Sequence, residues 1–334
     1  MPAGSRRLGV IPILIVALST LLAACTNAGA TASPSIAPTP TLAPTASPTP
    51  VAEFPVTLTD DEGTAVNLPA EPEKIVSLTP ATTEILFAIG AGERIVASDG
   101  GSDYPEAAKA LPHVATYNSV DIEKVVALEP DLVIVGGLGF TPADSITKLR
   151  SLKVPVIVVY ARSVDGVYAD IELLGAATGE NEKATAVTNT MRADMTAVSE
   201  AVSGGKKPRV YYEVGYDDAT GVIYAPGDDS FVAGMVTLAG ADAITGDPAT
   251  YQIPLEKLIE RDPEIIVLGT NPFYNPTPAA VMARAGWGVM TAVKNKDVRP
   301  VRDTEITRPS PRLPIGLRNL AAVIWPDATL PAAP

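Results

Sequence analysis

Short, mainly apolar runs alternate with longer segments of helical periodicity along most of the chain. The apolar runs lie at 74–78, 94–97, 132–135, 156–159, 210–214 and 265–268. Segments with a helical pattern follow or precede them at 81–89, 122–128, 143–152, 231–239 and 255–260. Runs that are apolar at nearly every position are typical of strands buried on both faces of a parallel sheet. The alternation therefore predicts βαβ units and an α/β fold.

The region 164–203 interrupts this alternation and predicts two consecutive helices, separated at Thr178-Gly179. In the second helix, over 181–203, apolar residues recur every three or four positions, which indicates one buried face. These residues are Val187, Met191, Met195, Val198 and Val202. At 1.5 Å per residue this helix would extend roughly 34 Å, enough to cross from one lobe to another. The sequence thus predicts two Rossmann-like lobes with parallel-rich sheets, joined by one long rigid helix.

The predicted domain boundaries follow from these patterns. Alternating residues with a turn signal at Asp60 to Gly63 predict a β-hairpin at the start of the folded part, near Phe54. The N-terminal lobe is expected over 54–163, the connecting helices over 164–207 and the C-terminal lobe over 208–330.

The first residues have the features of an export signal. Arg6 and Arg7 precede an apolar stretch, 8–22, that is short for a membrane span. The stretch ends in Leu22-Ala23-Ala24-Cys25, which resembles the lipobox of bacterial lipoproteins. We expect residues 1–24 to be removed and Cys25 to carry lipid, so that acyl chains anchor the protein to the cell membrane. The alternative is an uncleaved N-terminal helix with an incidental cysteine.

A linker rich in Pro, Thr, Ser and Ala follows Cys25 up to residue 53. It lacks the apolar content to fold, and its prolines favour an extended chain. Because Cys25 is the only cysteine, the folded part has no disulfide, no cysteine metal site and no thiol nucleophile.

Charge and residue content exclude several function classes. A formal net charge of -13 argues against a nucleic-acid partner, which requires clustered Lys and Arg. An enzyme is disfavoured because His113 is the only histidine and no nucleophile-elbow motif accompanies it. His113 is expected in a loop before a short strand, and a role as an axial metal ligand is disfavoured. The glycines of 136–139 follow a strand, but the other parts of a dinucleotide fingerprint are missing.

Trp287 and Trp325 are expected to pack in the C-terminal lobe.

Several motifs in order resemble one protein family. They are Ser77-Leu78-Thr79-Pro80-Ala81-Thr82-Thr83-Glu84, Ser102-Asp103-Tyr104-Pro105, 122–133, 255–258 with 262–266, and Arg308-Pro309-Ser310-Pro311-Arg312-Leu313. Together they resemble the class III periplasmic binding proteins of ABC importers, which bind cobalamin, ferric siderophores or haem. The resemblance is closest to the cobalamin-binding members. It implies two lobes with the ligand in the cleft between them, little closure of the lobes, and a monomer.

The resemblance also implies a set of ligand contacts. Thr79, Pro80 and Ala81 follow the first strand and open a helix, so they should line the cleft. Tyr104 matches a tyrosine that packs on the ligand, whereas Tyr117 and Tyr251 stand at or near tryptophan positions of the cobalamin binders. Flat rings suit a flat macrocycle. Asp303 and Arg308 fall in the last cleft loop, with spacing shifted by about one residue from the family. Each tyrosine also has an ordinary structural interpretation as a loop residue, and Pro80 as a helix-start proline.

Two glutamates are implied to contact the importer. Glu123 and Glu256 begin corresponding helices, which lead to Glu129-Pro130-Asp131 and Asp262-Pro263-Glu264 respectively. In the family, residues at these positions point outward and pair with arginines of the permease. The simpler explanation is that a carboxylate stabilises a helix N-terminus. The expected partners are the permease and ATPase subunits of the importer.

The identity of the ligand stays open at this point. A cobalamin-like corrinoid is the first choice, with haem or a ferric siderophore as alternatives; no resident cofactor or metal site is expected. An anionic siderophore would favour several basic groups, and only Arg308 and Arg312 are placed to supply them. Haem would be favoured if Tyr104 were an axial ligand. A structural or adhesive lipoprotein is a remote alternative.

Overall fold

The structure of the protein is a computed structural model that describes residues 54–116, 118–137 and 139–333. Cys25, the predicted signal and linker, and Tyr117 lie outside the described residues. Within them, no helix is long and apolar enough to cross a membrane.

The N-terminal lobe is built on a six-stranded sheet of order β6-β5-β4-β3-β7-β8. Only the β5–β6 pair is antiparallel. The strands are β3 (Ile75–Ser77), β4 (Ile95–Asp99), β5 (His113–Thr116), β6 (Ser119–Val120), β7 (Leu132–Gly136) and β8 (Val156–Val159). The helices are α1 (Pro80–Ala88), η1 (Gly92–Arg94), η2 (Glu106–Ala110), α2 (Ile122–Ala127) and α3 (Ala143–Ser151). The predicted hairpin is present as β1 (Val56–Thr59) and β2 (Ala65–Leu68).

The C-terminal lobe is built on a four-stranded parallel sheet of order β12-β9-β13-β14. Its strands are β9 (Arg209–Glu213), β12 (Asp242–Ile244), β13 (Ile265–Thr270) and β14 (Val298–Arg302), and a small hairpin pairs β10 (Gly215–Tyr216) with β11 (Ile223–Tyr224). The helices are α6 (Phe231–Leu238), α7 (Leu255–Arg261), α8 (Pro278–Met282), η3 (Trp287–Val289), α9 (Thr291–Asn295), α10 (Thr304–Thr307) and α11 (Leu313–Ile324). Parallel sheets in both lobes confirm the predicted α/β class.

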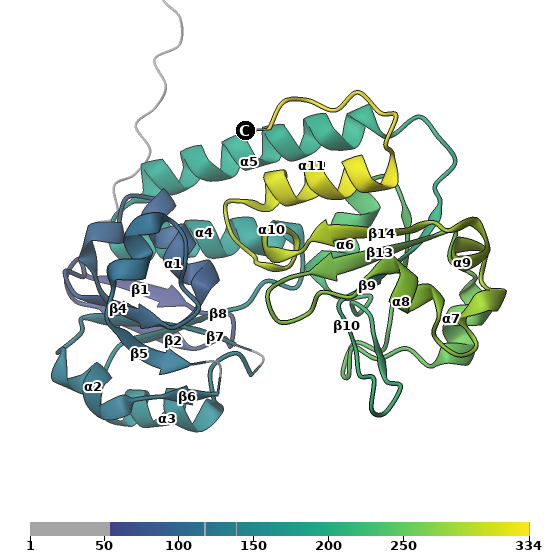
Figure 1. Cartoon of the computed structure of the whole chain (residues 1–334). Coiled ribbons are helices and arrows are strands. Elements are labelled where there is room, and N and C mark those ends of the chain that lie inside the picture. The colour runs from purple at the N-terminus through teal and green to yellow at the C-terminus, as the bar shows by residue number, and fades with distance from the viewer. Residues whose placement is uncertain (1–53, 117, 138, 334) are drawn as a thin grey trace, which may run out of the picture. The chain divides into compact units, whose positions relative to one another are not determined.

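Two helices connect the lobes. Ser163 caps α4 (Val164–Thr178) by accepting a hydrogen bond from Gly166 N, and Gly179 ends it at φ +74°, a conformation that favours glycine. The long predicted helix is α5 (Asn181–Ala201), about 32 Å long at 1.5 Å per residue. It packs on α1 of the first lobe and on α11 of the second, as Figure 1 shows. Its predicted apolar face is buried at Met191, Met195 and Val198.

One hydrophobic core is shared by the two lobes. A continuous cluster includes Ile134 on β7, Met195 on α5, Val210 on β9 and Leu317 on α11. Each lobe also has a second cluster of its own on the other side of its sheet. Because interiors of this kind are close-packed, the shared cluster resists relative motion of the lobes.

Candidate functional site

The parallel strands bring most of the predicted site residues to one edge of each sheet. Thr79 follows β3 and Tyr104 follows β4 in the first lobe, whereas Tyr251 follows β12 and Arg308 follows β14 in the second. Carboxyl ends of parallel strands are the usual place for a ligand site in open α/β sheets. Contacts between the lobes, described below, show that these two edges face each other.

The start of α1 is held by hydroxyl groups. Thr79 is the N-cap, and its Oγ1 accepts a hydrogen bond from Thr82 N at 3.3 Å, while Pro80 occupies the first turn. Thr83 Oγ1 donates to Ser77 Oγ at 2.8 Å and shares a hydrogen bond with Ser102 Oγ at 2.8 Å. The half-buried Thr79, Pro80 and Ala81 therefore lie on a rigid connection between β3, α1 and the loop after β4.

An ion-pair network joins the two lobes, and we call its five residues, Glu84, Asp103, Glu305, Arg308 and Arg312, the interlobe network. Glu84 on α1 is its centre, with a side chain that is 1% exposed. Arg308 Nη1 donates to Glu84 Oε1 at 2.7 Å and to Asp103 Oδ1 at 2.8 Å. Arg312 donates to both oxygens of Glu84 at 2.9 and 2.5 Å, and to Glu305 Oε1 at 2.9 Å. Each arginine thus contacts two carboxylates, and neither carries an uncompensated charge.

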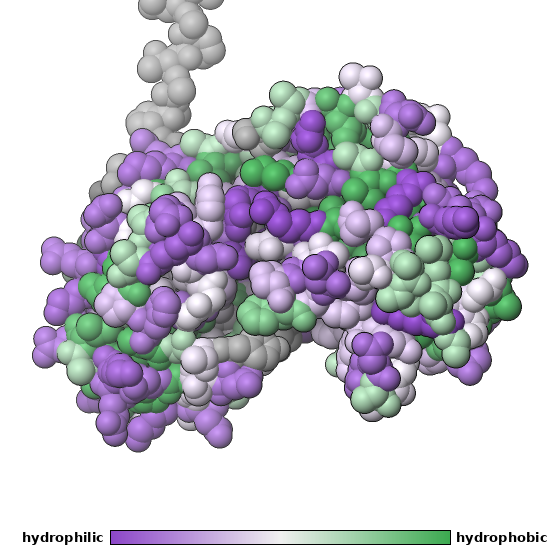
Figure 2. Space-filling view, viewed as in Figure 1, coloured by the Kyte–Doolittle hydropathy of each residue, from purple (hydrophilic) through white to green (hydrophobic). Residues whose placement is uncertain are grey.

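The same contacts fix how the lobes face each other. Glu84 and Asp103 follow strands β3 and β4, and Arg308 follows β14, so the carboxyl ends of the two sheets meet at this network. In Figure 2 hydrophilic atoms, drawn in purple, cover the junction between α1 and α10, and the surface is hollowed between the lobes below it.

Tyr104 lies directly on this network. Its side chain is 47% exposed, and the guanidinium carbon of Arg312 lies 4.3 Å from its ring centroid. A cation placed over a ring in this way helps to hold the ring in position. The predicted aromatic contact is therefore a fixed ring at the interlobe edge.

Asp303 and Arg308 differ from simple ligand contacts. Asp303 is buried and accepts a hydrogen bond from Asn271 Nδ2 at 2.9 Å, and its burial raises the pKa of the carboxyl group. Arg308 is engaged with Glu84 and Asp103. The polar groups of both residues are bound to other parts of the protein, and their predicted contact with the ligand stays a prediction.

Tyr251 lies on a separate loop of the C-terminal lobe. It adopts φ +54° and is 40% exposed, and its backbone is held by bonds from Tyr251 N to Asp247 O and from Ala225 N to Tyr251 O. In the described residues no ring contact joins it to Tyr104. The predicted arrangement of the tyrosines around one slot therefore stays a prediction.

Two exposed aromatic residues at the same strand ends were missed by the sequence analysis. Phe140 follows β7 and is 58% exposed, and Phe273 follows β13 and is 99% exposed. The sequence did contain one signal for them, because both residues follow predicted buried strands, where a ligand site is expected.

Glu123 and Glu256 occupy equivalent places in the lobes. Both are exposed in the first turns of α2 and α7, and neither forms an ion pair with another described residue. Glu129 and Asp262, which follow these helices, both adopt left-handed backbone conformations, at φ 50° and 42°.

The repeat continues into the following strands. Asp131 Oδ2 accepts a hydrogen bond from Lys74 N just before β3, and Glu264 Oε2 accepts one from Arg209 N at the start of β9. The near-repeat in the sequence is thus also a structural repeat.

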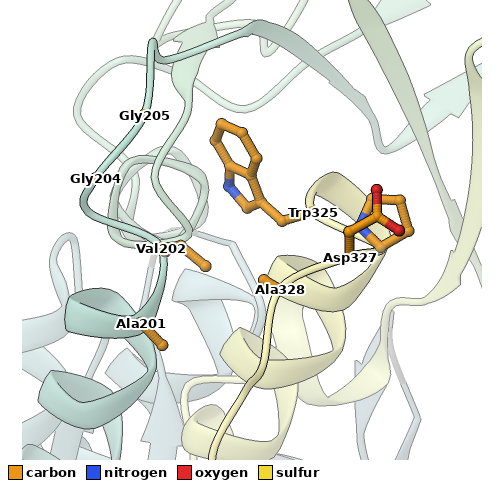
Figure 3. Close-up of a pocket in the computed structure, with 8 residues that line it drawn as sticks. Ala201, Val202, Gly204, Gly205, Trp325, Asp327 and Ala328 are labelled. Carbon is orange, nitrogen blue, oxygen red and sulfur yellow. The ribbon is translucent and has the colours of Figure 1, made fainter.

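A shallow pocket lies at the opposite edge of the C-terminal sheet. It has a volume of about 320 Å³ and is lined by Ala201, Val202, Gly204, Gly205 and residues 325–328 (Figure 3). Trp325 in its wall donates from Nε1 to Ala239 O, close to the amino end of β12. This pocket is remote from the strand ends that carry the site residues.

The chain is similar to known proteins. A sequence model described as periplasmic binding protein matches residues 75–303. This chain belongs to the periplasmic binding protein family. It is 34% identical over 280 residues to the uncharacterized ABC transporter substrate-binding lipoprotein YvrC of Bacillus subtilis, covering 82% of this chain and 87% of that protein. It is 30% identical over 271 residues to a cobalamin-binding protein of Halobacterium salinarum, covering 78% and 71% respectively.

Solved structures of periplasmic binding proteins have the same fold. A possible iron-binding, periplasmic solute-binding protein from Staphylococcus epidermidis matches with a TM-score of 0.66 at 27% identity, over 77% of this chain and 100% of that one. The periplasmic vitamin B12 binding protein BtuF of Vibrio cholerae matches with a TM-score of 0.64 at 24% identity, over 76% and 96%. The predicted two-lobed fold is confirmed. As a member of this family the protein is the substrate-binding component of an ABC importer and not an enzyme, and it acts outside the cytoplasm.

Proposed function

We propose that this protein captures cobalamin or a related corrinoid and delivers it to the permease of an ABC importer, and that a lipid on Cys25 anchors it to the membrane. The similarity to cobalamin-binding relatives supports this ligand class. The similarity to a substrate-binding lipoprotein supports the anchor.

The observation that carries the choice of ligand is the exposed ring of Tyr104 on a charge-compensated network. Arg308 and Arg312 were the basic groups available for an anionic chelate, yet each of them is already paired with two carboxylates. A ligand with carboxylate or catecholate groups would have to compete with those internal pairs. A corrinoid has amide side chains around its ring, so it needs an aromatic surface and hydrogen bonds but few basic groups.

Haem is the second candidate, and one observation favours it. No described residue forms a hydrogen bond with the Tyr104 hydroxyl, and the side chain is exposed, so the phenol oxygen could serve as an axial ligand to iron. The two ligands therefore assign different roles to the same residue, namely the ring for a corrinoid and the oxygen for haem.

Titration calorimetry of two Tyr104 variants with cyanocobalamin and with haemin tests the proposal. For a corrinoid we expect Tyr104→Phe to bind almost as tightly as the wild type, because the ring makes the contact. Tyr104→Ala should bind about tenfold more weakly, a loss of about 1.4 kcal/mol. Tight binding of haemin that Tyr104→Phe abolishes would instead favour haem. If the wild type does not bind cyanocobalamin, the choice of a corrinoid is wrong.

The proposed partners are the permease and ATPase subunits of the importer. Glu123 and Glu256 are the proposed contacts with the permease, one from each lobe. Their exposure, their equivalent positions and their lack of ion pairs with described residues support this role.

A further inference from the structure

Phe273 is a large apolar side chain that is almost completely exposed. It is 99% exposed, more than any other large apolar side chain among the described residues. It lies in a turn, 271–274, directly after β13. An aromatic ring in this position gains nothing from the protein's own core, so its role has to be sought in what surrounds the turn.

Several bonds fix the turn locally. Asn271 Oδ1 accepts hydrogen bonds from Phe273 N at 2.8 Å and from Tyr274 N at 2.9 Å. Asn271 N also donates to Tyr274 O at 2.8 Å. On the other side, Asn271 Nδ2 donates to the buried Asp303, which ties the turn to the end of β14.

A buried carboxylate holds the far end of the turn. Tyr274 donates from its hydroxyl to Glu213 Oε1 at 2.5 Å, and Arg284 forms an ion pair with Glu213 at 2.5 Å. The Glu213 side chain is fully buried. Burial and the neighbouring Glu213 raise the pKa of Tyr274, so the hydroxyl stays a hydrogen-bond donor. The backbone under Phe273 is therefore fixed at both ends.

The turn also lies at the edge of the C-terminal lobe that faces the other lobe. Asp303, its anchor, is five residues before Arg308, which contacts Glu84 and Asp103 of the N-terminal lobe. In Figure 1 the segment after β13 extends toward the N-terminal lobe.

We propose that Phe273 is a preorganised aromatic contact of the C-terminal lobe for the flat face of the bound macrocycle. This inference rests on the proposed function, because it requires a ligand with a planar ring system. A ring held on a fixed turn binds such a ligand with little loss of conformational entropy. Stacked or edge-on aromatic contacts typically change affinity by about two- to tenfold beyond the area they bury.

The test is calorimetric titration of the wild type, Phe273→Ala and Phe273→Leu with cyanocobalamin and with haemin. Phe273→Ala is expected to weaken binding about three- to tenfold, and Phe273→Leu to weaken it less. Val289→Ala is the matched control, since Val289 is also exposed, at 54%, but lies near the amino end of β13, where Ala292 N bonds to Pro263 O. It should bind like the wild type. All variants should melt like the wild type, because neither residue contributes to the core.

A second variant tests the positioning of the ring. Tyr274→Phe keeps the Phe273 side chain but removes the hydrogen bond from Tyr274 to Glu213 that fixes one end of the turn. The ring is then held less firmly, so ligand affinity should fall. If the wild type binds cyanocobalamin and Phe273→Ala binds it with the same affinity, this inference is wrong and the proposed function stands. Binding of haemin alone would overturn the corrinoid proposal, and the Phe273 variants would then be judged with haemin. Binding of neither chelate would overturn both.

Discussion

Replacing Glu84 by glutamine should destabilise the protein strongly, although the change is nearly isosteric. The Glu84 side chain is 1% exposed and accepts three hydrogen bonds from Arg308 and Arg312. Removing one partner of a buried ion pair costs about 3–5 kcal/mol. Here the two arginines keep Asp103 and Glu305 and are 18% and 14% exposed, which reduces the cost. We expect Glu84→Gln to lower the free energy of unfolding by about 2–3 kcal/mol.

Equilibrium unfolding in urea measures this loss. With a slope of about 2–3 kcal/mol per molar urea, the midpoint should fall by about 1 M. Glu106→Gln is the control, because Glu106 also pairs with a cation, Lys109 at 2.7 Å, but at an exposed position. It should leave the midpoint unchanged. If the midpoints of Glu84→Gln and the wild type coincide, the interlobe network does not stabilise the fold and the reasoning is wrong.

Three further predictions concern anchoring, docking and pH. Cys25→Ser should release the protein from membranes into the soluble fraction; unchanged partitioning would contradict the lipid anchor. Glu123→Lys or Glu256→Lys should abolish uptake in a transport assay while ligand affinity stays near the wild-type value; a collapse of binding would place the residue in the cleft or the fold. Burial, together with the charge of Asp61, raises the pKa of Asp170 to about 9, so wild-type stability should fall as pH rises from the ordinary carboxyl range toward 9. Asp170→Asn should remove this loss, so its melting temperature should exceed that of the wild type more at pH 8 than at pH 5; parallel pH profiles would refute the assignment.

Apart from the N-terminal hairpin, the strands that the sequence predicted are mainly those buried on both faces. The runs at 132–135 and 156–159 are apolar at every position because both faces of β7 and β8 are covered, and the structure has strands there. The sequence VRPVR of β14 gave no such signal. This strand is at the edge of its sheet, pairs only with β13, and buries only Val298 and Val301.

Helix α11 was missed for a different reason. It contains a proline near its start and Gly316 inside it, and both residues lower the helical signal. A Cβ at Gly316 would lie 2.1 Å from the carbonyl oxygen of Glu305, so this glycine allows α11 to approach α10 closely. His113, expected before a short strand, is the first residue of β5.

The site could be predicted only where its residues share a local motif. Tyr104 is in a short recognisable stretch, and the structure places it at the interlobe edge. The bonds between Glu84 and Arg312 join residues 228 positions apart, so no local pattern contains both partners. The position of Phe273 after a predicted buried strand was a signal in the sequence, but the bond that ties its turn to β14 joins Asn271 to Asp303, 32 positions away, and no local pattern contains both partners.

The shared core has a consequence for how an importer would recognise the loaded protein. Since one continuous cluster of side chains extends from β7 to β9, the spacing between α2 and α7 is set by packing and should change little when ligand enters. We then expect the distance between α2 and α7 to be the same with and without ligand. The affinity for the ligand is in that case not reduced by the need to populate a rare closed form. A permease that recognises only the spacing between α2 and α7 could not distinguish the ligand-free protein from the ligand-bound protein. The permease would then have to recognise the ligand itself, where it is exposed between the two lobes.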